Sequence, residues 1–572
     1  MPKNTQRLSL PLALSALLLS CFAVAGVAAD WPRWGRDNSC NMVSDEKCLP
    51  DSFSPGVKSA PPPSAPGTTT TTNTHAKAPK PDDNKFGSGI KNPDANLAGP
   101  QWGTSPKVPD VDPATTKNVR WIARMATHCY GSPVVAGGKV FVGVNSDTHY
   151  DEHHSTRGGG AELCFDAATG KLLWQLLIPA AGVVKKDPLF NYDCLNLGVC
   201  STAVVEGNRL YFCSNRDEVL CMDIRGETNG NDGPFRKEAE FMASEGEKPT
   251  TPLCPTDGDI IWRVNMLTHP DVECWPQDAN DCSILVVGDY LYVCPSNGVN
   301  RTHKVIPRPN CPSLIVIEKK TGKIIARDDA KVGPKILHGE WCSPSSGVVN
   351  GRQLVFFGAG DGCCYAFDAK PTPPERGERL GRLKTVWKFD LNAAAHREGK
   401  YRSKSGPSEC IATPVFYKNR VYASVGQDPK HGRGRGELVC IDATKTGDIT
   451  ESGKVWIFDE IDRSLSTVAI ADGLLFTADN SGRIFCLDAD TGKKHWMHDM
   501  QTPICCSPVV ADGKMYIGTD DGDFLIFAAS KEKKLINNVN LGSGIVSTPA
   551  IANGTIFIAT QSHLYAVAAE KK

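Results

Sequence analysis

A repeated pattern constrains the fold of this chain more than any other feature. From about residue 118 onward some eight copies follow one another, and those that open with "SPVVAGGKVFVGV" and "SPVVADGKMYIGT" show it most clearly. Each copy holds three alternating apolar runs separated by turns of the DG, DDG and DxxTG kinds, then a fourth run that usually contains tryptophan. Four short antiparallel strands per copy are typical of a propeller blade. The sequence therefore predicts an all-β fold, an eight-bladed β-propeller of four-stranded antiparallel blades, over residues 101–572.

The two ends of the repeat indicate how the ring closes. The last copy stops after its third run, at Val567, whereas a spare fourth-strand run, "NVRWIARM" at residues 118–125, precedes the first copy. An N-terminal strand that joins the C-terminal blade would leave no sheet edge unpaired. We therefore expect residues 118–125 to complete the last blade.

Tryptophans recur at one point of the fourth strand. Each can bury ~150–250 Å² between neighbouring blades, so we expect them to be core residues that dock one blade on the next. Two blades carry Ala326 and the pair Asn537–Asn538 at this point, which predicts weaker junctions there. The predicted docking residues are Trp121, Trp174, Trp262, Trp387, Trp456 and Trp496.

The fourth-strand motif resembles a known family. "DAATGKLLW" (166–174) and "DADTGKKHW" (488–496) are similar to the tryptophan-docking motif of the pyrroloquinoline quinone (PQQ) repeat family, over about residues 118–570. That family includes quinoprotein alcohol dehydrogenases and the propeller lipoprotein of outer-membrane barrel assembly, and "WPRWGRD" near the N-terminus resembles secreted PQQ-repeat proteins. The resemblance implies the propeller fold but no single activity, because the fold carries both enzymes and scaffolds.

The N-terminus predicts export. Lys3 and Arg7 precede an apolar run, and the small residues Val27–Ala29 form a cleavage site, so residues 1–29 are interpreted as a signal peptide. Lipid anchoring at Cys21 is the alternative, which the apolar run beyond Cys21 disfavours. No later stretch is apolar enough to span a bilayer, so we expect a periplasmic or extracellular protein.

Composition divides the rest of the chain and excludes one class of partner. A short segment at 30–53 is followed by a Pro/Thr-rich run at 54–100 that cannot bury a core, and we predict a disordered linker there. The formal net charge is -1, with 63 basic and 64 acidic side chains, which offers no electrostatic footprint for nucleic acid. The chain is expected to be a monomer.

The cysteines point to one face of the predicted ring. One set lies one to three residues before the Ser or Thr that opens a first strand, and first strands are innermost, so these residues are expected around one mouth of the channel. They are Cys129, Cys200, Cys282, Cys342, Cys410, Cys505 and Cys506, accompanied by His338, Glu340, Trp341, Glu409 and Arg463. Thiols, imidazoles and carboxylates could bind a soft metal there, or be packing residues and solvated loops. His149, His153 and His154 could bind metal adventitiously in an exposed loop.

The adjacent pair Cys505–Cys506 raises an enzymatic hypothesis by resemblance. In the quinoprotein dehydrogenases a vicinal disulfide lies over the quinone at this place in the repeat, which implies PQQ and calcium as cofactors. The calcium ligands and the aspartate base of those enzymes have no clear counterpart here; Glu340, Glu409 and Arg463 are the candidates. The leading hypothesis is therefore an exported binding or scaffold protein that meets an envelope protein through its channel mouth and long loops. A PQQ-dependent alcohol dehydrogenase and a polysaccharide-binding module are the alternatives.

Overall fold

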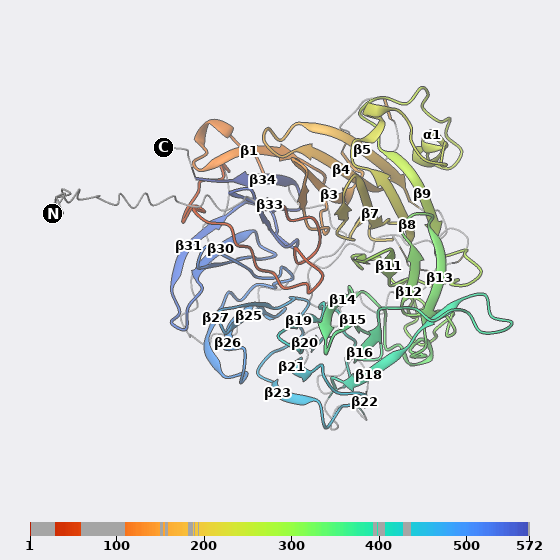
Figure 1. The fold of residues 1–572 in the computed structure, drawn as a ribbon. Coiled ribbons are helices and arrows are strands. Elements are labelled where there is room, and N and C mark those ends of the chain that lie inside the picture. The colour runs from red at the N-terminus through yellow and green to blue at the C-terminus, as the bar shows by residue number, and fades with distance from the viewer. Residues whose placement is uncertain are drawn as a thin grey trace.

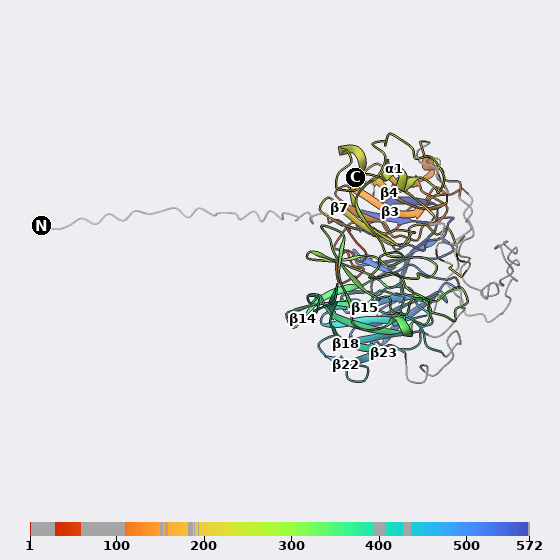
Figure 2. The same ribbon diagram turned by 90° about the vertical axis from the view of Figure 1, so that its right-hand side faces the viewer.

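Eight sheets, each with four antiparallel strands at its core, are arranged around a central channel in a computed structural model of the chain (Figure 1). Turned by 90°, the ring is a disc, shallower than it is wide (Figure 2). The structure describes residues 1, 29–58, 109–148, 153–154, 158–180, 187, 189–190, 192, 194–392, 397, 406–426 and 436–569. Residues 2–28 of the predicted signal peptide, with Cys21, residues 59–100 of the predicted linker, and His149 lie outside these residues.

Each blade begins with its innermost strand and runs outward. Blades 1 to 4 are β2 (Val134–Ala136), β3 (Lys139–Asn145), β4 (Gly159–Asp166), β5 (Leu172–Pro179); β6 (Val204–Glu206), β7 (Arg209–Cys213), β8 (Glu218–Asp223), β9 (Asp259–Asn265); β10 (Leu285–Val287), β11 (Tyr290–Val293), β12 (Ile315–Glu318), β13 (Lys323–Asp328); and β14 (Ser345–Val349), β15 (Arg352–Gly358), β16 (Cys363–Asp368), β18 (Thr385–Asp390).

Blades 5 to 8 repeat this order, and the last one takes its outer strand from the N-terminal side. They are β19 (Val415–Tyr417), β20 (Arg420–Val425), β21 (Glu437–Asp442), β23 (Lys454–Phe458); β24 (Ala469–Ala471), β25 (Leu474–Ala478), β26 (Arg483–Asp488), β27 (Lys494–Asp499); β28 (Val509–Ala511), β29 (Lys514–Gly518), β30 (Asp523–Ala528), β31 (Leu535–Asn540); and β32 (Ala550–Ala552), β33 (Thr555–Ala559), β34 (His563–Val567), β1 (Val119–Arg124).

The predicted closure is confirmed. Strand β1 pairs antiparallel with β34, with Trp121 opposite Ala566 and Arg124 opposite His563. Helix is scarce among the described residues: one short α-helix, α1 (Glu238–Met242), and 3₁₀ turns at Pro113–Thr115, Gly226–Asn229 and Gly333–Lys335. None of these helices is long and apolar enough to cross a bilayer.

The docking tryptophans show why the motif has its spacing. Trp174 lies opposite Cys164 within its blade, and its Nε1 donates to the Ile224 carbonyl of the next blade at 2.9 Å. The small residue opposite makes room for the ring. Gly170, in the DxxTG turn, has φ +72°, and a Cβ there would lie 2.5 Å from the Trp121 ring of the preceding blade. The same indole bond to the next blade is made by Trp121, Trp262, Trp387, Trp456 and Trp496.

The blade 3–blade 4 junction lacks this tryptophan and is held differently. The Tyr292 hydroxyl donates to the Ala369 carbonyl of blade 4, at the turn position that accepts an indole N–H elsewhere. In addition β17 (Gly381–Leu383), from the excursion between β16 and β18, pairs parallel with β13, so Ala326 faces Gly381. A second short strand, β22 (Gly447–Asp448), pairs in the same way with β18 of blade 4. Blades 3 and 4 therefore have five strands.

The segment after the predicted signal peptide contacts every blade. Residues 31–44, here called the inner strap, lie over the inner part of the ring (Figure 1, red) at the end of the channel where first strands finish. Each first strand bonds to it in turn: Val135 to Trp31, Val205 to Pro32, Val286 to Arg33 and Asn38, Ser346 to Asn38, Phe416 to Ser39, Ile470 to Asn41, Val510 to Met42 and Ser44, and Ile551 to Ser44. The strap therefore closes this end of the channel.

The described chain continues beyond residue 53. Phe53 packs edge-on against Phe524 of blade 7, with ring centroids 6.0 Å apart. Ser54 and Val57 then bridge Lys117 and Val111 in antiparallel pairs. Residues 54–58, assigned from composition to the linker, are thus held against the segment that leads into β1.

Candidate functional site

The channel is lined at its middle by one hydroxyl from each blade. Seven of these residues donate their backbone N–H to the hydroxyl of the next blade, for example Ser132 to Thr202 at 3.0 Å and Thr548 back to Ser132 at 2.9 Å. The Thr413 hydroxyl accepts the indole N–H of Trp34 in the strap, at 3.1 Å. We call this set the hydroxyl ring: Ser132, Thr202, Ser283, Ser343, Thr413, Thr467, Ser507 and Thr548.

A second ring lies two residues earlier in each blade, toward the mouth. Because side chains alternate along an extended chain, a residue two positions before the hydroxyl faces the same channel. This mouth ring is Tyr130, Cys200, Asp281, Trp341, Ile411, Leu465, Cys505 and Val546. With Trp34 below it, the two rings enclose a cavity of about 120 Å³. Asp281 is the one acidic residue in the mouth ring, and five of its eight residues are aromatic or aliphatic.

Most of the predicted cysteines face away from the channel. Cys200 and Cys505 lie in the mouth ring, whereas the others occupy odd positions before the hydroxyl and are buried within the blades. Their Sγ atoms donate to backbone carbonyls, as Cys342 does to Ser343 and Ala412 at 3.4 Å. Every cysteine that the structure describes is a free thiol, Cys505 and Cys506 included. The cysteines that face away from the channel and are buried within the blades are Cys129, Cys282, Cys342, Cys410 and Cys506.

The polar residues predicted beside the cysteines lie behind Trp341. His338 Nδ1 is 3.8 Å from Glu409 Oε1, and both side chains are buried. The His338 ring packs edge-on against Trp341, with centroids 5.0 Å apart, and against His303 at 4.7 Å. Glu340 is fully buried, and burial raises the pKa of its carboxyl to about 8. The structure thus brings these residues together, in the wall of the channel rather than in its lumen.

Two more of the predicted site residues, Arg463 and Cys505, lie near blades 6 and 7. Arg463 is buried, with its backbone carbonyl accepting the Asn480 N–H at 2.8 Å. Asn480 also donates to Cys505 Sγ at 3.4 Å, and that thiol contacts Asp520 Oδ2 at 3.6 Å. Burial raises the pKa of Asp520 to about 7 and that of the Cys505 thiol well above its usual range. A thiol in this setting is poorly nucleophilic.

Metal-ligating groups converge elsewhere. Among the described residues, sets of three or more such side chains with ligand atoms within 4.8 Å of one another occur in the blade 2 loop and include no channel residue. His154 is buried and paired through Nε2 with Asp257 Oδ1 at 2.8 Å. His153 is exposed, and its backbone carbonyl accepts the Thr250 hydroxyl at 3.2 Å.

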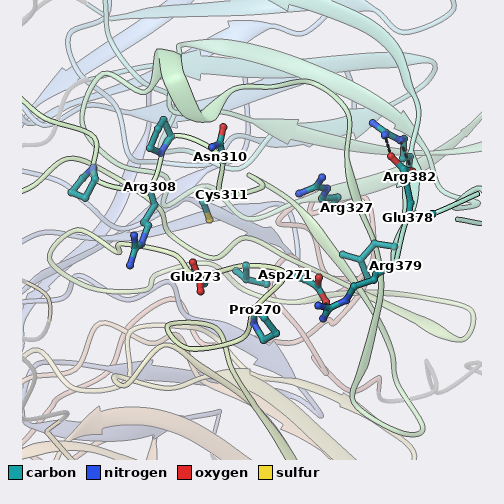
Figure 3. Close-up of a pocket in the computed structure, with 15 residues that line it drawn as sticks. Pro270, Asp271, Glu273, Arg308, Asn310, Cys311, Arg327, Glu378, Arg379 and Arg382 are labelled. Carbon is teal, nitrogen blue, oxygen red and sulfur yellow. Dashed lines mark hydrogen bonds and ion pairs between the residues drawn. The ribbon is translucent and has the colours of Figure 1, made fainter. Parts of the chain in front are cut away.

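A larger cavity of about 460 Å³ opens at the outer edge of blade 3 (Figure 3). Arg379, beyond β16, pairs across it with Asp271 at 2.9 Å. Arg308, in the long loop between β11 and β12, and Arg327, at the end of β13, form no ion pair within the described part of the chain. The volume of this cavity lies within the roughly 300–1,000 Å³ range of small-molecule sites.

The channel residues do not fit PQQ. A cavity of about 120 Å³ is well below the usual size of a cofactor site. A calcium ion beside the quinone would need oxygen ligands in the lumen, but Glu340 and Glu409 are buried in the wall. The tricyclic quinone therefore lacks room in this cavity, and Asp281 is the one carboxylate among its described lining residues.

Comparisons with known proteins agree with the fold. Residues 434–535 match the family model described as PQQ_2, outer membrane protein assembly factor BamB. No curated relative matches the sequence. A europium-containing methanol dehydrogenase is similar in structure, with a TM-score of 0.51 and 12% identity over 93% of this chain and 90% of that chain. BamB from Moraxella catarrhalis aligns with a TM-score of 0.46 and 11% identity over 79% of this chain and 98% of that one. The predicted fold is confirmed, and residues 434–535 match the predicted repeat type.

Proposed function

Because this chain is a β-propeller built from PQQ-type repeats, and such a fold carries both enzymes and scaffolds, we propose that it is a non-catalytic binding protein. It acts outside the cytoplasm and binds an envelope protein at the rim of its channel mouth. The signal peptide predicted at residues 1–29 supports the location. The matched family model, which describes an outer-membrane assembly factor, supports the kind of partner.

The observation that carries this proposal is the channel itself. The inner strap closes one end through bonds to all eight blades, and Trp34 occupies the space below the hydroxyl ring. About 120 Å³ remains, enough for a side chain inserted from a partner but not for a cofactor with its metal. A cavity of this size is suited to binding a side chain of a partner.

The cavity at blade 3 supports a more specific form of the proposal. Arg308 and Arg327 are exposed, and neither forms an ion pair with a described residue. Guanidinium groups bind carboxylates bidentately. We therefore expect the partner to present an acidic segment to this cavity.

The enzymatic alternative is tested by cofactor addition. The purified full-length chain is incubated with PQQ and either Ca²⁺ or Eu³⁺, desalted, and examined for quinone absorbance and dye-linked alcohol oxidation. We expect neither, with an authentic quinoprotein dehydrogenase as the positive control. Retention of PQQ near one equivalent, or alcohol oxidation that depends on it, would overturn the binding-protein proposal.

The acidic-segment proposal is tested with labelled poly-glutamate, measured by fluorescence anisotropy. Binding that weakens as salt rises is expected, since exposed charges are screened. The double variant Arg308→Glu/Arg327→Glu should abolish it, whereas Arg124→Glu, an exposed arginine on blade 8, should not. Equal loss in both variants would show that charge in general, not this cavity, is responsible.

A further inference from the structure

A group of carboxylates converges in the long loop between β8 and β9 of blade 2. The loop contains the 3₁₀ turn Gly226–Asn229 and helix α1 (Glu238–Met242), and it ends at β9. One oxygen each from Glu227, Glu238 and Asp259 lies within 4.8 Å of the others. Glu238 and Asp259 are 0% exposed, although acidic side chains are almost never fully buried unless they are paired.

Two buried oxygens in this group have no hydrogen-bond partner. They are Glu238 Oε1 and Asp259 Oδ1. The second oxygen of each carboxylate is bonded: Asn231 Nδ2 donates to Glu238 Oε2 at 2.6 Å, and the Asp232 N–H donates to Asp259 Oδ2 at 3.0 Å. Leaving a buried acceptor unsatisfied costs about 1–3 kcal/mol, and more when it is charged, so a group that bonds to these two oxygens would stabilise the loop.

A neighbouring carboxylate shows what ordinary compensation looks like. Asp223 at the end of β8 is also fully buried, but Arg209 and Arg225 pair with it at 2.8 and 2.9 Å. Those ion pairs accompany a lowered pKa for Asp223 despite its burial. Arginine therefore neutralises one side of the loop only.

The other side has no such cation. Among the described residues, Glu227, Glu238 and Asp259 form no ion pair; Arg225 is engaged by Asp223 and lies 3.6 Å from Asp232, and Arg236 donates to the Asn231 side-chain oxygen. Burial, followed by repulsion from the neighbouring carboxylates, raises the pKa of Glu227 to about 7 and that of Asp259 to about 6. Three carboxylates that repel one another therefore lie close together in this loop.

We propose that Glu227, Glu238 and Asp259 bind a hard divalent cation, Ca²⁺, with Asn231 orienting two of the carboxylates. Carboxylate oxygens are the ligands that Ca²⁺ prefers, and its flexible coordination suits a site built from a loop and a strand. Mg²⁺ retains several waters and is seldom enclosed by protein alone. Asn231 Nδ2 donates to Glu227 Oε1 at 3.1 Å as well as to Glu238, and so holds both side chains on one side of the cation.

The cation would fix the loop to the propeller. Phe241 and Met242 of α1 are buried in the core shared with blade 1. A Cβ on Gly226, next to Glu227, would lie 2.9 Å from the Trp174 ring, so the site is beside a blade-docking tryptophan. Binding therefore links the loop, β9 and the blade 1–blade 2 junction.

The proximity of Trp174 provides a direct readout. The purified chain is treated with EDTA, exchanged into chelator-free buffer and titrated with Tb³⁺, which replaces Ca²⁺ and emits when an adjacent indole is excited. We expect sensitised emission that saturates near one equivalent and is displaced by Ca²⁺. Ca²⁺ should also raise the thermal midpoint, because a ligand of the folded state stabilises it by mass action.

Matched variants separate the site from general acidity. Glu238→Gln and Asp259→Asn keep the side-chain shape and should weaken Tb³⁺ and Ca²⁺ binding at least ten-fold. Glu240→Gln, an exposed position of the same helix, should leave it unchanged. The proposal is overturned if the EDTA-treated wild-type chain gives no saturable Tb³⁺ emission and no Ca²⁺-dependent shift, or if Glu238→Gln and Glu240→Gln behave alike. Equal shifts with Mg²⁺ and Ca²⁺ would overturn the assignment to calcium.

Discussion

The two ends of the central channel are built from different interactions. At the strap end, residues 31–44 bond to the first strand of every blade, through backbone groups at blades 1, 2, 4, 5 and 7 and through side chains at blades 3, 6 and 8, and Trp31 and Met42 are buried. At the mouth, side chains line the opening, and groups with raised pKa values, such as Asp520 and Glu340, lie just behind it. At the strap end, the hydrogen-bonding groups of the first strands are paired with the strap. At the mouth, buried carboxyl groups lower the stability of the fold.

The difference indicates where function lies. Backbone bonds carry no selectivity, and a segment that touches all eight blades acts on the ring as a whole. Buried carboxylates with raised pKa values are destabilising, and stability is commonly sacrificed at functional sites. The difference therefore supports a structural role for the strap end and the binding role proposed for the mouth.

The largest expected effect is at the strap. Trp31→Ala removes a buried indole, and large-to-small changes of this kind cost about 3–5 kcal/mol in the free energy of unfolding. Urea unfolding monitored by circular dichroism measures the loss. Trp34→Ala is the matched control: Trp34 is only partly buried, so its replacement should cost less. If Trp34→Ala costs as much as Trp31→Ala, the strap is not anchored as the buried contacts indicate.

The next effect is at the mouth and depends on pH. The pKa of Glu340 is about 8 in the folded chain against an ordinary 4.5, so as pH rises the unfolded chain loses this proton first. Between pH 4.5 and about 8, the Glu340 carboxyl therefore lowers the free energy of unfolding progressively as pH rises, by about 1.4 kcal/mol per pH unit. Glu340→Gln should make the protein more stable at the upper end of this window and flatten its pH dependence.

The control for this prediction is an exposed acid. Glu451→Gln lies on the surface of blade 5 and should leave the slope of stability against pH unchanged. Thermal midpoints recorded at about one-unit pH intervals measure both variants. Identical slopes for wild type and Glu340→Gln would show that this carboxyl does not resist ionisation in the folded state.

The fold could be predicted because one pattern of strands and turns recurs along the sequence. The copies of the strand-and-turn pattern predicted the blade count, and the spare run at 118–125 predicted the closure. The compensation at the blade 3–blade 4 junction could not be predicted, because the Tyr292 bond to Ala369 and the pairing of β13 with β17 join residues distant in sequence. The expectation of a weak junction from Ala326 alone missed both.

The mouth residues were only partly predictable. The prediction included cysteines one, two or three residues before the hydroxyl. Side chains alternate along a strand, so that only the residue two positions before the hydroxyl faces the channel. Applying that rule to the sequence would have found Tyr130, Asp281 and the other members of the mouth ring. The inner strap had no comparable signal, since its bonds to the blades use mostly backbone groups that any sequence offers.

The smallest effect concerns the point where the two ends meet. The Thr413 hydroxyl in the hydroxyl ring accepts the Trp34 indole N–H from the strap. Thr413→Val removes that acceptor and should cost about 1 kcal/mol in the free energy of unfolding. A double-mutant cycle with Trp34→Phe isolates the bond, because both single changes remove it, and a coupling energy of at least about 0.5 kcal/mol is expected. Additive effects in the cycle would mean that the strap closes the channel without this link, so that the two ends are independent of one another.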